Sequence, residues 1–345
     1  MAVSRGRSGL RRALAGVLAV ALVAALGHLA LWLVAVIRLE AEFVAWQTQC
    51  RDAGWTVTSD LPSWGGWPFE AALDVPRLSL GGGAAQIPGG FTWQGTGVRL
   101  AVTPMQPRVL QIRLGGPQRL RVAALPEVVI QADRLTFMLK LDRSGPAELA
   151  ASGLRLRTDA GETMVGTLTG QGMAQRATGP DEAALAVSLA AEAVSLPGNW
   201  GLGSRIATVS ADATLTGPLR PASTAAAYAA AWRDGGGTLQ VSRFALGWGP
   251  LGLSAGATFR LDAQLQPAGS GTARIVGYGE TLDALAAARV VAPRAATAAK
   301  AVLGLLATAP EGGGAPRIDV PFELQDRLFS VARFPLARVV EWVWQ

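Results

Sequence analysis

The sequence predicts a mainly β protein with an N-terminal transmembrane helix. Its body is expected to be a long antiparallel, meandering and curved sheet, with two helices near the C-terminus. Three observations predict this fold class. Residues 13–37 form an uncharged apolar run of 25 residues. Beyond residue 55, apolar and polar residues alternate with a period of two, which is typical of half-buried strands. Gly-Gly, Gly-Pro and Pro-Gly pairs separate these segments and indicate short turns.

The apolar run 13–37 is long enough to cross a membrane, because about 20 helical residues span a hydrocarbon core of about 30 Å. The tail before it, residues 1–12, is basic and contains no acidic residue. The positive-inside rule therefore places the N-terminus in the cytoplasm and the chain beyond Arg38 across the membrane. A cleaved signal peptide is the alternative, but its apolar region usually has about 7–15 residues, so the longer run favours an uncleaved anchor.

The charge outside the membrane run excludes a nucleic-acid partner. Five of the 31 basic residues lie in the tail or flank the run, and the remaining 26 nearly balance the 25 acidic residues. A nearly neutral body lacks the positive surface that binds a phosphate backbone. Cys50 is the single cysteine, so no intrachain disulfide forms. It is either a site of lipidation or intermolecular bridging, or one apolar position on a helix.

Residues 38–54 predict a stalk helix that continues out of the membrane and ends at Gly54. Apolar residues spaced i, i+4, i+7 and i+11 form one face of this helix, which is predicted to dock on the body or to pair with a partner helix. The residues of this face are Leu39, Phe43, Trp46 and Cys50. The tryptophans just beyond the stalk, among them Trp64 and Trp67, indicate a membrane-interface belt, an apolar binding mouth, or packing in the sheet and its turns.

The body is predicted to have two β-rich parts, residues 55–217 and 218–345, joined by Ala-rich sequence that forms a short helix. In the later part, the segment 257–266 alternates strictly and predicts a long strand. Its apolar face is marked by Phe259, Leu261 and Leu265. Further strands are predicted at 69–80, 91–102, 109–114, 118–122, 128–133, 135–141, 148–156, 162–173, 184–196, 205–216, 237–244 and 317–324.

Two helices are predicted at about 281–307. The first begins at Thr281, which fits an N-cap with Asp283 in the first turn. Pro293 interrupts the pattern and separates the second helix from the first. These helices are too short to cover the whole apolar face of a long sheet.

Two short motifs match patterns of catalytic or cofactor-binding sites, but the neighbouring sequence lacks the residues and elements that such sites need. Residues 252–256 match G-x-S-x-G around Ser254, but a nucleophile elbow needs a following helix and a histidine base, and the single histidine is His28 in the membrane run. Residues 247–252 match G-x-G-x-x-G, but Pro250 and the following strand contradict a dinucleotide fold. One histidine and one cysteine cannot assemble a zinc or iron site. We expect no enzyme, no catalytic residue, no cofactor and no metal.

Seven segments follow one another along the chain: Gly-Trp-Pro-Phe at 66–69, Leu-Asp-Val-Pro-Arg-Leu at 73–78, Phe-Thr-Trp at 91–93, 109–118, Leu-Gly-Trp-Gly-Pro-Leu at 246–251, 261–269 and 320–326. In this order they resemble the domain of unknown function 2125 family over about residues 38–340. Arg327 departs from the family pattern, because such proteins usually carry a glycine after the aspartate, and this departure bears on a tight turn there.

The resemblance implies a bacterial inner-membrane anchor with a β-rich body in the periplasm, and it supplies no catalytic residue. The single span and long sheet are also similar to AsmA-type envelope proteins, which are thought to handle phospholipids along a curved, apolar-lined sheet. Two hypotheses are favoured over a third, in which scattered carboxylates converge in a deep polar pocket and act as an enzyme. The protein binds or passes lipid along an apolar sheet face, or it is a structural or protein-interaction component of the envelope whose sheet closes over a packed core.

Overall fold

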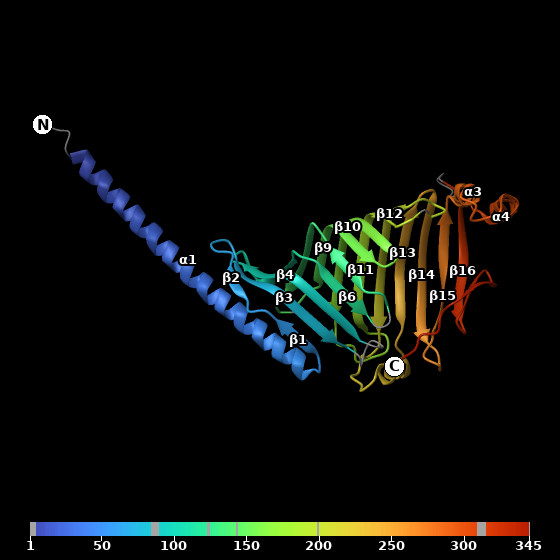
Figure 1. Ribbon diagram of the computed structural model, residues 1–345, viewed down its shortest axis with the longest axis horizontal. Helices are drawn as coiled ribbons and strands as arrows, with labels where there is room; N and C mark the ends of the chain where they lie inside the picture. Colours follow the sequence, from blue (N-terminus) through green and yellow to red (C-terminus); the bar gives the residue numbers. More distant parts are fainter. Residues whose placement is uncertain are drawn as a thin grey trace.

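The computed structural model describes residues 5–83, 90–122, 125–142, 144–198, 200–308 and 315–344. Within these residues, 18 strands form one antiparallel sheet and four helices accompany it. Figure 1 shows a long helix at one end of the molecule and strands that lie side by side from β3, next to this helix, to β16. The predicted fold class is confirmed.

Helix α1 (Arg5–Asp52) is continuous, so the predicted membrane run and stalk form one helix. Residues 1–4 of the predicted basic tail lie outside the described residues. The helix ends before Gly54, whose φ of +83° is a conformation that glycine adopts without steric cost. Its stretch from residue 14 to residue 27 is exposed, whereas its C-terminal part lies along the first strands of the sheet (Figure 1).

All strand pairs are antiparallel, and from β8 onward the sheet is a meander in which each strand pairs with the next. The strands of the first half are β1 (Thr56–Ser59), β2 (Ser63–Gly65), β3 (Ala71–Gly82), β4 (Phe91–Thr103), β5 (Gln106–Leu114), β6 (Gln118–Val122), β7 (Val128–Gln131), β8 (Arg134–Lys140) and β9 (Ala147–Thr158). Those of the second half are β10 (Gly161–Ala174), β11 (Ala183–Ser195), β12 (Arg205–Thr216), β13 (Leu239–Trp248), β14 (Leu251–Leu261), β15 (Pro267–Val276), β16 (Arg317–Gln325), β17 (Leu328–Val331) and β18 (Phe334–Arg338).

Three positions in the sheet are each shared by two short strands. β1 and β2 pair with opposite ends of β3, β5 and β6 pair with opposite ends of β4, and β8 and β7 do the same on β9. No strand pairing among the described residues joins β1 or β2 to β18. The sheet is therefore open, with one edge beside α1 and the other at β18.

The three short helices lie at strand ends. Helix α2 (Ala225–Asp234) connects β12 to β13, and α3 (Tyr278–Ala287) and α4 (Pro293–Leu306) lie between β15 and β16. Figure 1 shows α3 and α4 beyond the upper ends of β15 and β16. The predicted boundary at 217/218 falls just before α2, but β12 pairs directly with β13, so the sheet continues across it.

Thr224 caps the N-terminus of α2, since its side-chain oxygen accepts a hydrogen bond from the backbone N–H of Ala227 (3.2 Å). We expect Thr224→Ala to lower the free energy of unfolding by about 1 kcal/mol, because an unpaired helix N–H is left behind. Urea titration monitored by circular dichroism measures this loss. Thr224→Ser keeps the cap and is expected to behave like the natural protein; equal losses in both variants would show that the cap is not the cause.

One predicted strand has the wrong bounds, and several strands were not predicted, among them β15. The strand predicted at 257–266 begins earlier and ends at Leu261, because residues 262–266 form a turn in which Asp262 Oδ1 accepts backbone hydrogen bonds from Gln264 and Gln266 (both 2.8 Å). Leu265 lies in this turn with φ +58°, not on a strand. No strand was predicted at 267–276, where the Gly-rich β15 lies.

The tight turn after Asp326 is present despite Arg327. Asp326 and Arg327 have φ values of +50° and +64° and form the two-residue loop between β16 and β17. Two-residue hairpin loops favour residues with positive φ, and glycine usually takes the second position. Here the Arg327 side chain instead forms an ion pair with Glu341 (2.7 Å).

Candidate functional site

The candidate site is one face of the sheet from β11 to β17, here called the apolar face. Residues directly opposite each other in an antiparallel ladder point to the same side. Four rows of paired residues cross this part of the sheet, and each row is apolar or glycine throughout. The rows are Leu185-Leu215-Leu239-Phe259-Gly269-Leu324-Phe329, Val187-Ala213-Val241-Ala257-Gly271-Phe322-Val331, Leu189-Ala211-Phe244-Ala255-Ala273-Val320 and Ala191-Val209-Leu246-Leu253-Ile275-Ile318.

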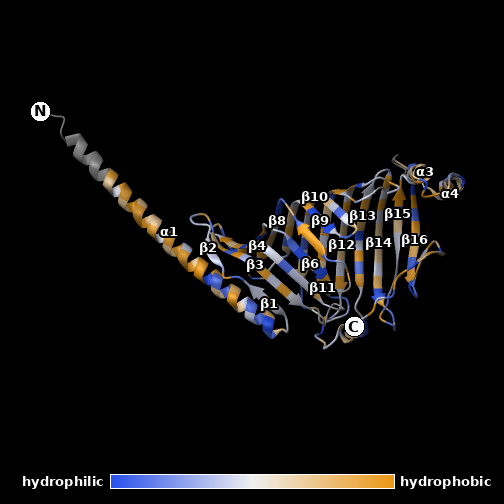
Figure 2. Ribbon diagram, in the orientation of Figure 1, coloured by the Kyte–Doolittle hydropathy of each residue, from blue (hydrophilic) through white to orange (hydrophobic). Residues whose placement is uncertain are grey.

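The opposite side, here called the polar face, is built from the alternate positions. One of its rows crosses seven strands, and every residue of this row except Ala186 has a hydroxyl, amide or carboxylate side chain. That row is Ala186-Thr214-Gln240-Thr258-Ser270-Glu323-Ser330. Figure 2 shows the resulting alternation of hydrophobic and hydrophilic segments along β13 to β16. The apolar face is therefore the side of the sheet whose side chains are stabilised by burial against other protein atoms or a ligand.

The described residues bury only part of the apolar side of the sheet. Two buried apolar clusters occur among them: one joins α1 to β1, β3 and β4, and the other centres on Leu154, Val165 and Val194 of β9 to β11. In β13, β14 and β15, all of whose residues are described, not one residue is fully buried. On β11, Leu185 and Leu189 of the apolar face are 36% and 42% exposed.

Phenylalanine rings supply apolar surface where β15 has glycine. A Cβ built on Gly269 would lie 2.8 Å from Phe259 Cδ1, and one on Gly271 would lie 2.5 Å from Phe322 Cζ. The rings of Phe259 and Phe322 therefore cover these glycines from the neighbouring strands. Phe322 also packs against Phe329, with ring centroids 5.8 Å apart. The glycines let large rings lie flat against the sheet.

The described contacts of the short helices lie at strand ends, and within the four rows only Ile318 (2% exposed) and Leu324 (8% exposed), both on β16, are buried. In α2, Trp232 Nε1 donates to the carbonyl oxygen of Thr216 at the end of β12 (2.7 Å). In the α3–α4 region, Leu285 and Val290 lie against Gly201, in the connection before β12. Neither contact involves a residue of the four apolar rows.

The predicted docking face of the stalk lies against the sheet, with one difference. Phe43 is buried in the cluster with Val36, and Leu39 and Cys50 pack against that cluster. Trp46 stacks on Phe43 (5.8 Å between ring centroids) but lies at the exposed margin. The position facing the sheet is taken instead by Gln47.

Gln47 is buried and polar, so the hydrophobic pattern of the sequence could not reveal it. Its Nε2 donates to Ser59 Oγ (3.1 Å), and its Oε1 accepts from Arg51 Nη2 (3.0 Å). Both partners lie near the C-terminal end of α1 or on β1. The amide thus fixes the end of the helix to the first strand.

A charged cluster joins the loop before β3 to the next two strands. Glu70 forms ion pairs with Arg113 (2.7 Å) and Arg99 (3.1 Å), and Arg99 also pairs with Asp74 (3.2 Å). Burial raises the pKa of the Glu70 carboxyl, but the hydrogen bonds and charges of Arg113 and Arg99 outweigh this effect and hold the pKa below its usual value. The cluster is structural, since its charges are paired with one another.

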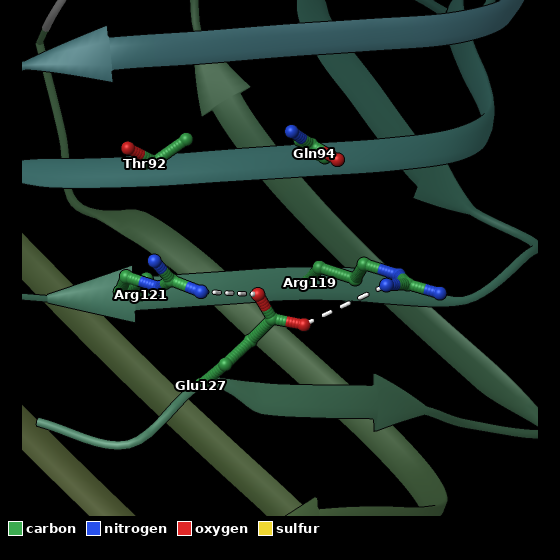
Figure 3. Close-up of a pocket in the computed structure, with 5 residues that line it drawn as sticks. All are labelled: Thr92, Gln94, Arg119, Arg121 and Glu127. Atoms are coloured by element: carbon green, nitrogen blue, oxygen red, sulfur yellow. Dashed lines mark hydrogen bonds and ion pairs between the residues drawn. The ribbon is translucent and has the colours of Figure 1, made fainter.

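A hollow of about 170 Å³ lies over β4, β6 and the segment before β7 and is lined by Thr92, Gln94, Arg119, Arg121 and Glu127 (Figure 3). The Glu127 carboxylate lies between Arg119 (3.6 Å) and Arg121 (3.2 Å). Both arginines are thus already paired, and the hollow is open to solvent. We assign no ligand to it.

The catalytic motifs lie in strands and turns. Ser254 is in the middle of β14, paired with Ala245 and Arg274, and no helix follows it. Gly249 lies at the β13–β14 turn with φ +55°. His28 Nε2 donates to the carbonyl oxygen of Pro68 (2.6 Å). Among the described residues, no group of three His, Cys, Asp or Glu side chains is placed to hold a metal ion.

One comparison with known proteins identifies the family of this chain. The family model described as "Uncharacterized protein conserved in bacteria (DUF2125)" matches residues 32–339, from the docked part of α1 to the strand at the far edge. Comparisons with curated proteins and with solved structures find no match. The likeness to AsmA-type proteins stays a prediction. Because the match covers most of the chain, the protein belongs to the DUF2125 family of bacterial proteins.

Proposed function

We propose that this protein is a non-enzymatic, membrane-anchored protein that binds phospholipid acyl chains on the apolar face and passes them along the sheet. Helix α1 would anchor it in the bacterial inner membrane, with the N-terminus in the cytoplasm and the sheet in the periplasm. One helix of the described residues is long and apolar enough to cross a membrane. The basic residues before the helix support this orientation.

The observation that carries the proposal is the partly exposed apolar face of β11 to β15, on which no residue of β13, β14 or β15 is fully buried. Exposed apolar patches of this kind mark binding surfaces, because monomeric soluble proteins rarely leave them open. Burying one CH₂ group fully contributes about 0.8 kcal/mol. An acyl chain that lies on the apolar face therefore gains binding energy from the whole row of side chains. No particular polar residue is required.

The dimensions of the apolar face fit this ligand. The apolar-face positions of β11 run from Leu185 to Ala191, a distance of about 20 Å at the usual strand rise. The acyl chains of one leaflet extend over about 15 Å, half of the hydrocarbon core. One strand length can thus hold an acyl chain with room to spare. The anchor keeps this surface next to its lipid source and raises the effective lipid concentration.

The test is photo-crosslinking from neighbouring positions on opposite faces of β14. A photoreactive phenylalanine analogue replaces Phe259 on the apolar face or, as the matched control, Thr258 on the polar face. After irradiation of cells, the full chain is purified and phospholipid adducts are identified by mass spectrometry. We expect adducts at position 259 and at most a trace at position 258, because the same anchor carries both probes.

Equal yields of lipid adduct at the two positions, or none at position 259, would overturn the proposal. A reproducible protein adduct at position 259 would favour the alternative, an interaction component of the envelope. One observation favours that alternative: every residue of the edge strand β18 is exposed, and an unpaired edge strand can accept a strand from a partner. A photoreactive probe at Phe334 on β18 reports on this edge in the same experiment.

A further inference from the structure

The exposed part of α1 is shorter than a membrane core. His28, the first residue that contacts the body, lies sixteen positions after Arg12, the last charged residue before the apolar run. This length of helix spans about 24 Å, whereas the hydrocarbon core is about 30 Å thick. Any tilt of the helix shortens its reach further. The part of the body that contacts His28 therefore meets the membrane if Arg12 stays at the opposite border.

The segment 61–70 follows α1 toward the membrane. Trp64 Nε1 donates to Glu40 Oε2 (2.9 Å), Trp32 Nε1 donates to the carbonyl oxygen of Glu70 (2.8 Å), and His28 Nε2 donates to that of Pro68 (2.6 Å). Counted from Arg12, Trp32 lies about 30 Å along the helix, at the expected outer border of the core. Pro68 is thus held slightly inside this border.

The side chains around Pro68 are apolar and exposed. Trp67 is 54% exposed and Phe69 is 82% exposed. In water such rings are costly, whereas aromatic rings are favoured at the border between lipid and water. The two hydrogen bonds to α1 hold the loop in place, so these rings cannot fold back onto the sheet without breaking them.

Two neighbouring turns add apolar side chains at the same end of the sheet. Ala71 pairs with Val102, which places the β4–β5 turn and its Met105, 95% exposed, beside the start of β3. The backbone N–H of Leu141 donates to the carbonyl oxygen of Arg108 (2.9 Å), so the exposed Leu141 lies at this end too. Farther from α1, the β10–β11 connection at the same end is polar and includes Arg176, Asp181 and Glu182.

We propose that Trp67, Phe69, Met105 and Leu141, here called the membrane tip, insert into the lipid leaflet that faces the body. The inference rests on the proposed function through its membrane anchor. It adds a second attachment, which fixes the tilt of the sheet relative to the bilayer. With α1 as the only contact, the body could swing away from the surface; with the tip inserted, the strands next to α1 stay at the lipid border.

The test measures the depth of single residues in vesicles. The full chain with Cys50→Ala carries one new cysteine at Phe69, Met105, Leu125 or Leu22, labelled with an environment-sensitive fluorophore. The vesicles contain phosphatidylethanolamine and phosphatidylglycerol, with or without a phospholipid that bears a nitroxide quencher on its acyl chain. Leu125 is the matched control, because it is apolar and 65% exposed but lies beyond Val122, at the opposite strand end.

We expect the probes at Phe69 and Met105 to lose more than half of their fluorescence to the nitroxide lipid and to shift to the blue, and the probe at Leu125 to change little. The probe at Leu22, in the exposed stretch of α1, reports on the anchor itself. If the probe at Leu22 is quenched but the probe at Phe69 is quenched no more than the probe at Leu125, the membrane tip is overturned and the anchor stands. Loss of quenching at Leu22 would instead overturn the anchor, and with it the proposed function.

Discussion

Leu73→Ala is expected to lower the free energy of unfolding by about 3–5 kcal/mol. Leu73 lies on β3, is 0% exposed and packs in the cluster that includes Val36 and Phe43 of α1. Removing its side chain leaves a cavity between the helix and the sheet, because neither can move closer without breaking the hydrogen bonds that join them. Urea unfolding of the detergent-solubilised chain measures the effect as a lower transition midpoint at unchanged slope.

The control for this cavity is Leu328→Ala. Leu328 begins β17, is 42% exposed and belongs to no buried cluster of the described residues. Its truncation is expected to change the free energy of unfolding by no more than about 0.5 kcal/mol, as is usual at the surface. Similar losses in the two variants would mean that α1 does not pack on the sheet in solution and that the cluster is looser than its burial indicates.

The sequence predicted those strands whose own side chains alternate. The range 205–216 predicted for β12 agrees with the structure at both ends, and the predicted position of β6 agrees as well. In such strands the period of two is a local property, since successive side chains point to opposite faces. The position of α1, including its end before Gly54, was likewise predictable from helical spacing and a glycine stop.

The sequence could not predict β15, because its apolar surface belongs to other strands. Gly269 and Gly271 occupy apolar-face positions without side chains, and the rings that cover them come from Phe259 and Phe322. A pattern based on the segment's own residues therefore shows no strand. The opposite error at Leu265 has the same origin: the alternation continues past Leu261, but a turn stabilised by Asp262 ends the strand.

The partial exposure of the apolar face could not be predicted from the sequence either. Alternation shows that one side of each strand is apolar, but it does not show what lies against that side. Here α1 covers the first strands, and the apolar rows of β11 to β15 are left partly exposed. The charged cluster around Glu70 was missed for a related reason, since its acid and its two arginines are separated by 29 and 43 residues and meet only through strand pairing.

Glu70→Gln is expected to lower the free energy of unfolding at neutral pH by about 1–3 kcal/mol, because Arg113 and Arg99 lose a charged partner that is mostly shielded from water. Arg99 keeps its contact with Asp74, and Arg113 keeps a hydrogen bond to Gln111, which limits the loss. The unfolding midpoint in urea at pH 7 measures it.

The pH dependence identifies the charge as the cause. The pKa of Glu70 in the folded protein is lowered from its ordinary value of 4.5. The carboxylate therefore contributes stability that is fully present above that ordinary value and is lost as the pH falls through the lowered folded value. Stability of the natural protein should thus fall more steeply on acidification below about pH 5 than that of Glu70→Gln.

The matched control is Glu323→Gln, on the polar face of β16, where the side chain is exposed and the described residues give it no ion pair. Its stability should follow that of the natural protein at every pH. If Glu70→Gln also ran parallel to the natural protein through the acidic range, the ion pairs of Glu70 would contribute nothing to the folded state. The hydrogen bonds of the loop backbone, among them those to Trp32 and His28, would then hold the loop that carries Glu70 without help from its carboxylate.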